Sequence, residues 1–458
     1  MEIRDSIHGM IRLEAEELPI VESPYFQRLR QIKQLGFAEY SFPGALHNRS
    51  IHSLGAMHTA TQVFDQILRP HPQASSSRIP HVTLERWRSV VRLAALLHDI
   101  GHGPLSHTTE FAMPTVEALA LPALVPVPHP QRKATHEDYT LKMILDSGLT
   151  PLLKKAGSSL GFKPEHIASL IEPQLELKDD FFIEQISSLG SAAQESVDFR
   201  PLLQQLISSE LDADRMDYLR RDSLYAGVSY GQFDFNWLLG NLTYHIHERK
   251  SFLCLEHRAL YAFEDFLISR FHMFLMVYFH HKTVIFDEML AQYLGSPECD
   301  YHLPSDIEAY CQYDDQQLYH HLSQSKNSWA QRITQNRPYR MLIELHSGIP
   351  AQTSNRAEQN RILQQLENEL SHKQIPALRI HSTSELSKYF RRPGDPIFVR
   401  YDNHYHPASH IPLEQCTDLF QKYGENRTIS RLYVAPEDEP RCRTRHSPEA
   451  GSKQEEST

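Results

Sequence analysis

The stretch that decides the fold runs from Leu96 to His107 and reads LLHDIGHGPLSH. It completes an apolar run that starts at residue 90, which indicates that the His98-Asp99 pair ends a deeply buried helix. The glycines and the proline that follow break this helix sharply. Ionisable groups at such a place are costly unless they have partners. The position therefore favours a functional pair over a chance dipeptide.

Two more residues complete a set of metal-ligand types. His52 lies in a predicted helix over residues 51–68, and Asp214 lies in one over residues 199–221. Two imidazoles and two carboxylates suit one divalent ion (Mn, Fe, Mg, Zn or Ni) with coordination positions left open. Open positions would let the ion bind a phosphate oxygen and lower the pKa of a bound water. We therefore expect His52, His98, Asp99 and Asp214 to form a metal site.

Further histidines crowd the same part of the sequence. His102 and His107 follow the His98-Asp99 pair closely, and His136 opens the next predicted helix. His107 and Glu110 are three residues apart, so on a helical turn the carboxylate can orient the imidazole and raise its pKa. A general acid or base needs such an arrangement. Any one of these histidines could instead be an exposed or capping residue, and that alternative is strongest for His136.

Cations and aromatic residues recur at helical spacings beside these groups: Arg49, Arg215, Tyr218, Asp222, Arg270, Phe274 and Tyr278. Arginine binds phosphate oxygens with a bidentate fork, and tyrosine offers a ring to a sugar or a base. The pattern predicts a phosphate-containing substrate. The alternative is a set of inter-helix salt bridges and core aromatics, which is as good an account of Tyr278 taken alone.

The 458 residues divide into three regions by pattern and composition. Residues 1–330 read mainly as helices. Residues 331–435 contain short predicted strands at 341–345, 377–380, 396–401 and 430–434, which indicates a smaller α/β lobe. Residues 436–458 are polar and are expected to be a disordered tail. The predicted fold class is mainly α.

Charge, cysteine usage and hydropathy exclude several classes. The net charge of −11 makes nucleic acid an unlikely partner, because phosphate-backbone binding needs a basic surface. Five cysteines lie far apart, which is typical of a reducing, cytoplasmic protein. The most apolar stretch, residues 271–279, is too short to span a bilayer, so no membrane association is expected.

Six ordered motifs resemble those of the HD-domain deoxynucleoside triphosphate triphosphohydrolases, both the vertebrate members, here without their sterile-alpha-motif domain, and the bacterial ones. The motifs are DSIHG (5–9), FQRLRQIKQLG (26–36), FPGALHNRSIHSLG (42–55), LLHDIGHGPLSH (96–107), THE (135–137) and LDADRMDYLRRD (211–222). They extend over about the first 290 residues, and the C-terminal lobe resembles the family more weakly. The resemblance implies a helical HD-superfamily core.

The resemblance also implies residue roles. The four metal-ligand candidates match the family's metal ligands, and His102, His107, Glu110 and His136 match its catalytic group. Arg49, Arg215 and Arg270 match phosphate-binding positions, while Gln34, Leu35, Tyr218, Asp222 and Tyr278 match the pocket for the sugar. Water would attack the α-phosphorus of a dNTP and release a deoxynucleoside and triphosphate.

Several positions depart from the family pattern. Phe274 stands where the vertebrate enzymes have a phosphate-contacting histidine. The family's nucleotide effectors bind at subunit contacts, and Gln27 and Arg30 match positions there, but Glu22 and Arg4 replace an Asp and an Asn. A homo-oligomer, a dimer or tetramer, is expected, with a nucleotide effector as a further possible ligand.

Three functions remain open on the sequence alone. The first is a dNTP triphosphohydrolase, and the second is an HD phosphohydrolase acting on another nucleotide or phosphate ester. The third is a nucleic-acid-binding or sensor module with a non-catalytic HD site. The three arginines favour a polyphosphate substrate, and the acidic balance disfavours the third function.

Overall fold

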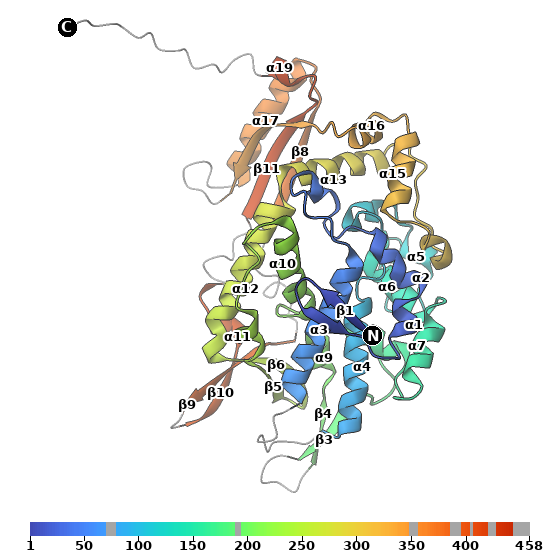
Figure 1. Cartoon of the computed structure of the whole chain (residues 1–458). Helices are drawn as coiled ribbons and strands as arrows, with labels where there is room; N and C mark the ends of the chain where they lie inside the picture. Colours follow the sequence, from blue (N-terminus) through green and yellow to red (C-terminus); the bar gives the residue numbers. More distant parts are fainter. Residues whose placement is uncertain are drawn as a thin grey trace, which may run out of the picture.

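The computed structural model describes residues 1–69, 79–187, 194–347, 356–384, 395–403, 406–419 and 427–442 (Figure 1). The expected fold class is confirmed, because a helical core carries a smaller C-terminal α/β part. Within the described residues, no helix is both long enough and apolar enough to cross a bilayer.

Three long helices form the centre of the core. Helices α3 (Arg49–Leu68) and α4 (His81–Leu97) pack side by side, and α10 (Ala213–Ala226) packs against α3. Two of the three begin at a side-chain cap: the Asn48 side chain caps α3, and the Asp212 side chain accepts a hydrogen bond from the Arg215 N–H at the start of α10. The apolar run of α4 is completely buried from Val90 to Leu97. The buried end of α4 therefore delivers His98 and Asp99 to the middle of the molecule.

Shorter helices surround this centre. They are α1 (Leu18–Val21), α2 (Pro24–Gln27), α5 (Val116–Leu119), α6 (His136–Leu145), α7 (Thr150–Gly157), α8 (Pro164–Ile171), α9 (Arg200–Ile207), α11 (Phe235–Leu239), α14 (Ile307–Tyr310), α15 (Asp315–Gln324) and α16 (Ser328–Thr334). Short stretches of 3-10 helix lie between them: η1 (Arg28–Gln31), η2 (Gly36–Tyr40), η3 (Ser106–Ala112), η4 (His257–Ala259) and η6 (Leu413–Gln415). Helix α16 runs across residue 331, where the sequence placed a domain boundary.

Two long helices expected from the sequence are each broken. The predicted helix 199–221 is α9 followed by α10, because residues 208–212 form a turn that the Asp212 side chain caps. The predicted helix 261–294 is α12 (Leu260–Met273), a π-helical turn η5 (Phe274–Tyr278) and α13 (His281–Leu294). The π turn changes the phase of the helix, so spacing alone did not give the relative directions of Arg270 and Tyr278.

Strands within residues 1–330 were not expected. Strands β1 (Glu2–Asp5) and β2 (Gly9–Arg12) form an N-terminal hairpin. A second sheet contains β3 (Ile183–Ser187), β4 (Gln194–Asp198), β5 (Leu242–His247) and β6 (Lys250–Glu256). It also takes in β9 (Phe398–Asn403) and β10 (His406–Pro412), so the strand predicted at 396–401 pairs with the core and not with the C-terminal lobe.

The C-terminal lobe is a three-stranded antiparallel sheet in the order β7 (Arg340–His346), β11 (Arg427–Val434), β8 (Ala377–Ser384). Helix α17 (Arg356–His372) covers it and shares a small apolar core that includes Leu363 and Leu432. In Figure 1 this lobe lies at the opposite end of the molecule from the β9–β10 hairpin. The expected tail begins with helix α19 (Glu439–Cys442), and residues 443–458 lie outside the described range.

Candidate active site

The four predicted metal ligands lie together where α3, α4 and α10 meet. The Nε2 atom of His52 is 3.0 Å from Asp214 Oδ1 and 3.7 Å from Asp99 Oδ2. The Nε2 atom of His98 is 3.5 Å from Asp99 Oδ1 and 3.5 Å from Asp214 Oδ1. Ligand atoms of His52, His98 and Asp99 all lie within 4.8 Å of one another. Four points that are distant in sequence thus meet at one place.

The two imidazoles are turned so that Nε2 faces the carboxylates. His98 donates from Nδ1 to the carbonyl of Ala95 at 2.8 Å, and His52 donates from Nδ1 to Asp217 at 2.9 Å. Both Nε2 atoms are buried and lack a hydrogen-bond partner among the described residues. Buried imidazole nitrogens without partners, facing two carboxylates, are a donor set that fits a divalent cation.

Electrostatics at this cluster favour a cation. Burial lowers the pKa of His52, but Asp214 and Asp217 outweigh burial and raise the pKa to about 10. Burial likewise lowers the pKa of His98, while Asp99 and Asp214 raise it to about 9. The carboxylates therefore stabilise a positive charge between them, and a bound divalent metal ion would provide that charge while the imidazoles stay neutral.

A second group of imidazoles lies beside the first. The rings of His102 and His136 stack at 3.8 Å between centroids with 12° between their planes, and His107 meets both rings edge-on. Glu110 Oε1 lies 2.6 Å from His136 Nδ1 and 3.3 Å from His107 Nδ1. Burial, Arg49 and His136 together hold the pKa of His102 well below its usual range.

This second group is better suited to proton transfer than to metal binding. Although ligand atoms of all three histidines lie within 4.8 Å of one another, lone pairs of imidazole lie in the ring plane. Two parallel stacked rings therefore cannot both direct a lone pair at one ion between them. Glu110 instead orients His107 and His136, as a carboxylate orients a general acid or base.

Close packing of the turn after α4, at Gly101, against α6 holds the two groups in register. A Cβ atom on Gly101 would lie 2.1 Å from the His136 carbonyl oxygen and 2.4 Å from the Thr140 nitrogen. Only glycine permits this approach. Thr140 adds hydrogen bonds to the His98 carbonyl and from the Gly101 N–H, at 3.1 and 3.0 Å, and Arg28 donates to the His102 carbonyl at 2.6 Å.

A cavity of about 450 Å³ opens over both groups. The site residues predicted from sequence that line it are Gln34, Leu35, Arg49, Asp99, His102, His107, His136, Asp214, Tyr218, Asp222 and Tyr278. Phe274 lines it as well. Such a volume is in the range of cavities that hold a small organic ligand. Arg49 contacts Asp99 and donates from Nε to Ser106 at 2.9 Å, so it lies at the metal-ligand end.

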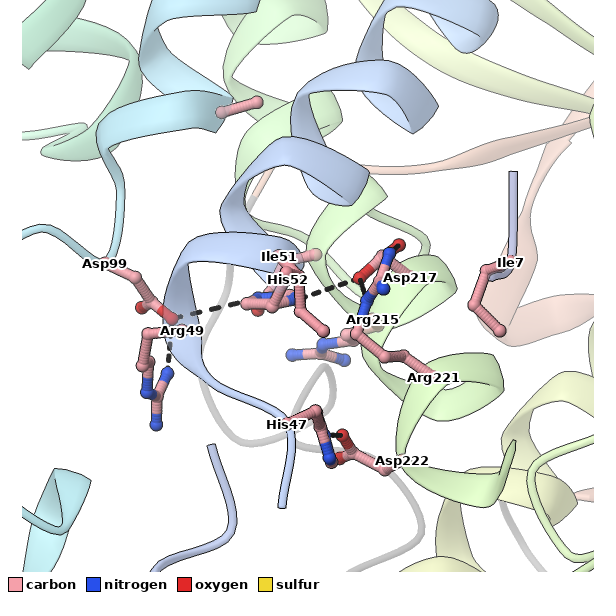
Figure 2. Close-up of polar contacts among 12 residues, drawn as sticks. Ile7, His47, Arg49, Ile51, His52, Asp99, Arg215, Asp217, Arg221 and Asp222 are labelled. Carbon is pink, nitrogen blue, oxygen red and sulfur yellow. Dashed lines mark hydrogen bonds and ion pairs between the residues drawn. The ribbon is translucent and has the colours of Figure 1, made fainter. Parts of the chain in front are cut away.

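The predicted sugar pocket is partly organised without a ligand. Tyr278 donates its hydroxyl hydrogen to Asp222 Oδ2 at 2.8 Å. His47 Nε2 lies 2.7 Å from Asp222 Oδ1, a contact that Figure 2 shows. These contacts fix the carboxylate of Asp222. Gln34 Oε1 is buried, lines the cavity region and has no hydrogen-bond partner among the described residues. It is therefore available as an acceptor for a ligand.

Two of the three predicted phosphate-binding arginines do not line this cavity. Glu210 is buried and lies 3.2 Å from Arg215 Nη1 and 3.1 Å from Arg270 Nη2. Asp212 lies 3.4 Å from Arg215 Nε. These acidic partners hold both guanidinium groups outside the set of lining residues, which leaves Arg49 as the arginine of that set.

Sequence reasoning missed several residues beside the predicted ones: His47, Glu210, Asp217 and Asp287. Asp217 and His47 lie inside the quoted motifs, so their proximity to the ligands was the available signal. Asp287 lines the cavity and accepts a hydrogen bond from Thr108 at 2.9 Å. Burial raises the pKa of Asp287 to about 7. No pattern in the sequence marked Asp287, because the π turn before α13 changes the helical phase.

Two protein-family descriptions match successive parts of this chain. The HD domain family matches residues 49–222, and the HD associated region matches residues 233–373. The first match contains all four residues that converge in the structure. Residues 49–222 therefore form an HD domain.

Individual proteins that are similar to this chain include bacterial and vertebrate members. Protein YwfO of Bacillus subtilis is 32% identical over 61% of this chain and 52% of YwfO. Deoxynucleoside triphosphate triphosphohydrolase SAMHD1 of Bos taurus is 28% identical over 68% of this chain and 52% of that protein. The chain thus spans about half the length of these curated relatives. The crystal structure of a hypothetical protein from Aquifex aeolicus is similar with a TM-score of 0.71 and 25% identity, over 97% of this chain and 98% of that chain.

Proposed function

We propose that this HD-domain protein is a metal-dependent dNTP triphosphohydrolase. The observation that supports the proposal most is the meeting of His52, His98, Asp99 and Asp214. Two of the four, Asp99 and Asp214, line a cavity that is also lined by the stacked imidazoles and by Asp222 and Tyr278. A divalent cation held by these four side chains would supply Lewis-acid chemistry at a phosphate oxygen. The likeness to SAMHD1 supports a dNTP as the substrate.

The histidines and Glu110 beside the metal-ligand cluster carry out the proton transfer that hydrolysis needs. Water attacks the α-phosphorus, a new P–O bond forms, and the bond from phosphorus to the 5′-oxygen of the sugar breaks. Glu110 holds His107 and His136 through their Nδ1 atoms, which leaves the Nε2 atoms to move the proton that the departing 5′-oxygen needs. His102 stays neutral beside Arg49, so it adds a hydrogen-bonding group and no positive charge.

The sugar pocket positions the substrate for this step. Asp222 accepts hydrogen bonds from its protein neighbours and has further lone pairs for a sugar hydroxyl. Tyr278 presents its ring to the cavity, and Gln34 and Leu35 close the pocket. Such contacts raise the rate by holding the reacting atoms in line.

A second candidate is hydrolysis of a smaller phosphate ester by the same site. One observation favours it: Glu210 holds Arg215 and Arg270 away from the cavity, and Phe274 lines the wall where the vertebrate enzymes have a histidine. A triphosphate carries more charge than one lining arginine can balance. A dNTP would therefore require Arg215 and Arg270 to exchange Glu210 for phosphate oxygens.

Product analysis decides between these two functions. Purified protein is incubated with Mn²⁺ or Mg²⁺ and each of several dNTPs, NTPs and nucleoside monophosphates. Release of intact triphosphate and deoxynucleoside supports the proposal, whereas orthophosphate or pyrophosphate supports the second candidate. Repeating the assay with added nucleotides, together with measurement of the mass in solution, tests the predicted effector and homo-oligomer.

A further inference from the structure

The residue behind the metal-ligand cluster is Asp217, which is completely buried on α10. Its Oδ2 lies 2.9 Å from His52 Nδ1, the nitrogen opposite the one that faces Asp99 and Asp214. Figure 2 shows His52 between Asp99 and Asp217, with contacts on both sides of the ring. Asp217 thus contacts a predicted ligand while lying outside the cluster itself.

Three other groups hold the Asp217 carboxylate. Arg221, one helical turn along α10, donates from Nε to Oδ2 at 2.8 Å and from Nη2 to Oδ1 at 2.9 Å. His8 Nε2 lies 2.7 Å from Oδ1. Arg221 also reaches Asp5 at 2.9 Å; Asp5 is the last residue of β1, and His8 lies in the turn between β1 and β2. The N-terminal hairpin therefore closes the back of this network.

Helix α3 carries a glycine where this network passes. A Cβ atom at position 55 would lie 2.1 Å from Asp217 Oδ1 and 2.2 Å from Arg221 Nη2. Glycine inside a helix costs about 1 kcal/mol relative to alanine. Gly55, three residues after His52, thus leaves space for a buried carboxylate directly behind the imidazole.

We propose that Asp217 is a positioning residue for the metal ion, which fixes the tautomer and orientation of His52 and is itself fixed by the β1–β2 turn. With the proton held at Nδ1, the Nε2 lone pair is directed at the ion in every molecule. A carboxylate partner also makes the imidazole a stronger donor than a carbonyl partner does. The His98 ligand has the weaker arrangement, since its Nδ1 bonds to the Ala95 carbonyl.

The alternative is that Asp217 only ties the N-terminal hairpin to the core through Arg221. The geometry distinguishes the two roles, because one carboxylate oxygen is shared between His52 and Arg221. A purely structural pair would leave metal affinity unchanged when it is altered. The proposal rests on the metal site of the proposed function and does not depend on the identity of the substrate.

The test is Co²⁺ binding to metal-stripped protein, followed by the visible absorption of the bound ion. Asp217→Asn keeps the shape of the side chain and removes its charge. It should weaken Co²⁺ binding by about 10- to 100-fold and alter the Co²⁺ spectrum. The matched control is Glu17→Gln, because Glu17 is buried and bonded to Arg92 at 2.6 Å, as Asp217 is to Arg221, but touches no predicted ligand. Its affinity and spectrum should equal those of the wild type.

A second variant keeps the test decisive should Asp217→Asn fail to fold. Asp5→Asn loosens Arg221 without touching His52, and it should weaken Co²⁺ binding in the same direction but less. If the folded Asp217→Asn protein, or the Asp5→Asn protein, has the same Co²⁺ affinity and spectrum as the wild type, the positioning role of Asp217 is refuted while the proposed metal site stands. Wild-type protein that binds no Co²⁺ would overturn both this inference and the proposed metal site.

Discussion

Replacement of Glu110 by glutamine removes one charge and leaves the volume of the side chain unchanged. The carboxylate lies 2.6 Å from His136 and 3.3 Å from His107 through a single oxygen. Burial raises the pKa of Glu110, but its hydrogen bonds to His107 and His136 outweigh burial and lower the pKa to about 2, from an ordinary value of 4.5. At about 1.4 kcal/mol per pH unit, these contacts favour the carboxylate by roughly 3 kcal/mol.

The amide oxygen of glutamine can still accept from both imidazoles, but it carries no negative charge, so it no longer favours the protonated form of His107 or His136. We expect kcat to fall by about 10²- to 10⁴-fold, the range for losing an oriented general acid or base. A loss of 3 kcal/mol corresponds to about 10²-fold, which sets the lower end. KM and metal content should change little, since Glu110 contacts neither the metal-ligand cluster nor the sugar pocket.

The assay is triphosphate release from a dNTP at saturating metal, measured beside the metal content of each variant. Glu117→Gln is the control, because Glu117 is an exposed residue on α5 whose carboxylate accepts a hydrogen bond from Gln131 and lies outside both groups of the site. Turnover by Glu110→Gln within about twofold of the wild type, far below the loss expected for a general acid or base, would refute the role of the imidazole group.

Three further predictions follow from the cavity and its walls. Gly101→Ala forces a methyl group against α6 and should lower stability by about 1–3 kcal/mol, seen as a lower Tm. Asp287→Asn should stabilise the protein more at pH 8 than at pH 5 in denaturant titrations. Because the native pKa of Asp287 is raised to about 7, the wild-type protein becomes less stable as pH rises from the unfolded pKa of this carboxyl through 7, and the asparagine variant avoids that loss. Equal gains in stability at both pH values would contradict this. Phe274→His adds a phosphate-binding group to the cavity and should lower KM for a dNTP but not for a monophosphate ester, so parallel changes for both substrates would count against a triphosphate at this wall.

Much of the fold was predictable because helical periodicity is strong around the site. The buried run before His98 marks α4, and the capped start of α3 lies close to its predicted position. Strands β5 and β6 were missed because their residues are buried or half-buried on both faces, which removes the alternation that marks a strand. The strand at 396–401 was found, but sequence could not reveal that its partner is β6.

The candidate site was predictable to the extent that each residue type carries its own chemistry. The four metal-ligand candidates do converge, and the imidazole group lies beside them, which stays consistent with the predicted roles. Pairing was not predictable, because long-range contacts leave no spacing in the sequence. Glu210 illustrates this: it is separated from Arg270 by sixty residues, yet its carboxylate lies 3.1 Å from that guanidinium group.

The decisive measurement is the metal content of wild-type protein and of Asp99→Ala after metal stripping, reloading with Mn²⁺ and desalting. Asp99 lies within reach of His52, His98 and His102, so its loss should empty the cluster. The account predicts about one tightly held ion per wild-type chain and a near-complete loss in the variant, together with loss of hydrolysis. An Asp99→Ala protein that keeps its ion and its turnover would contradict the assignment of the site.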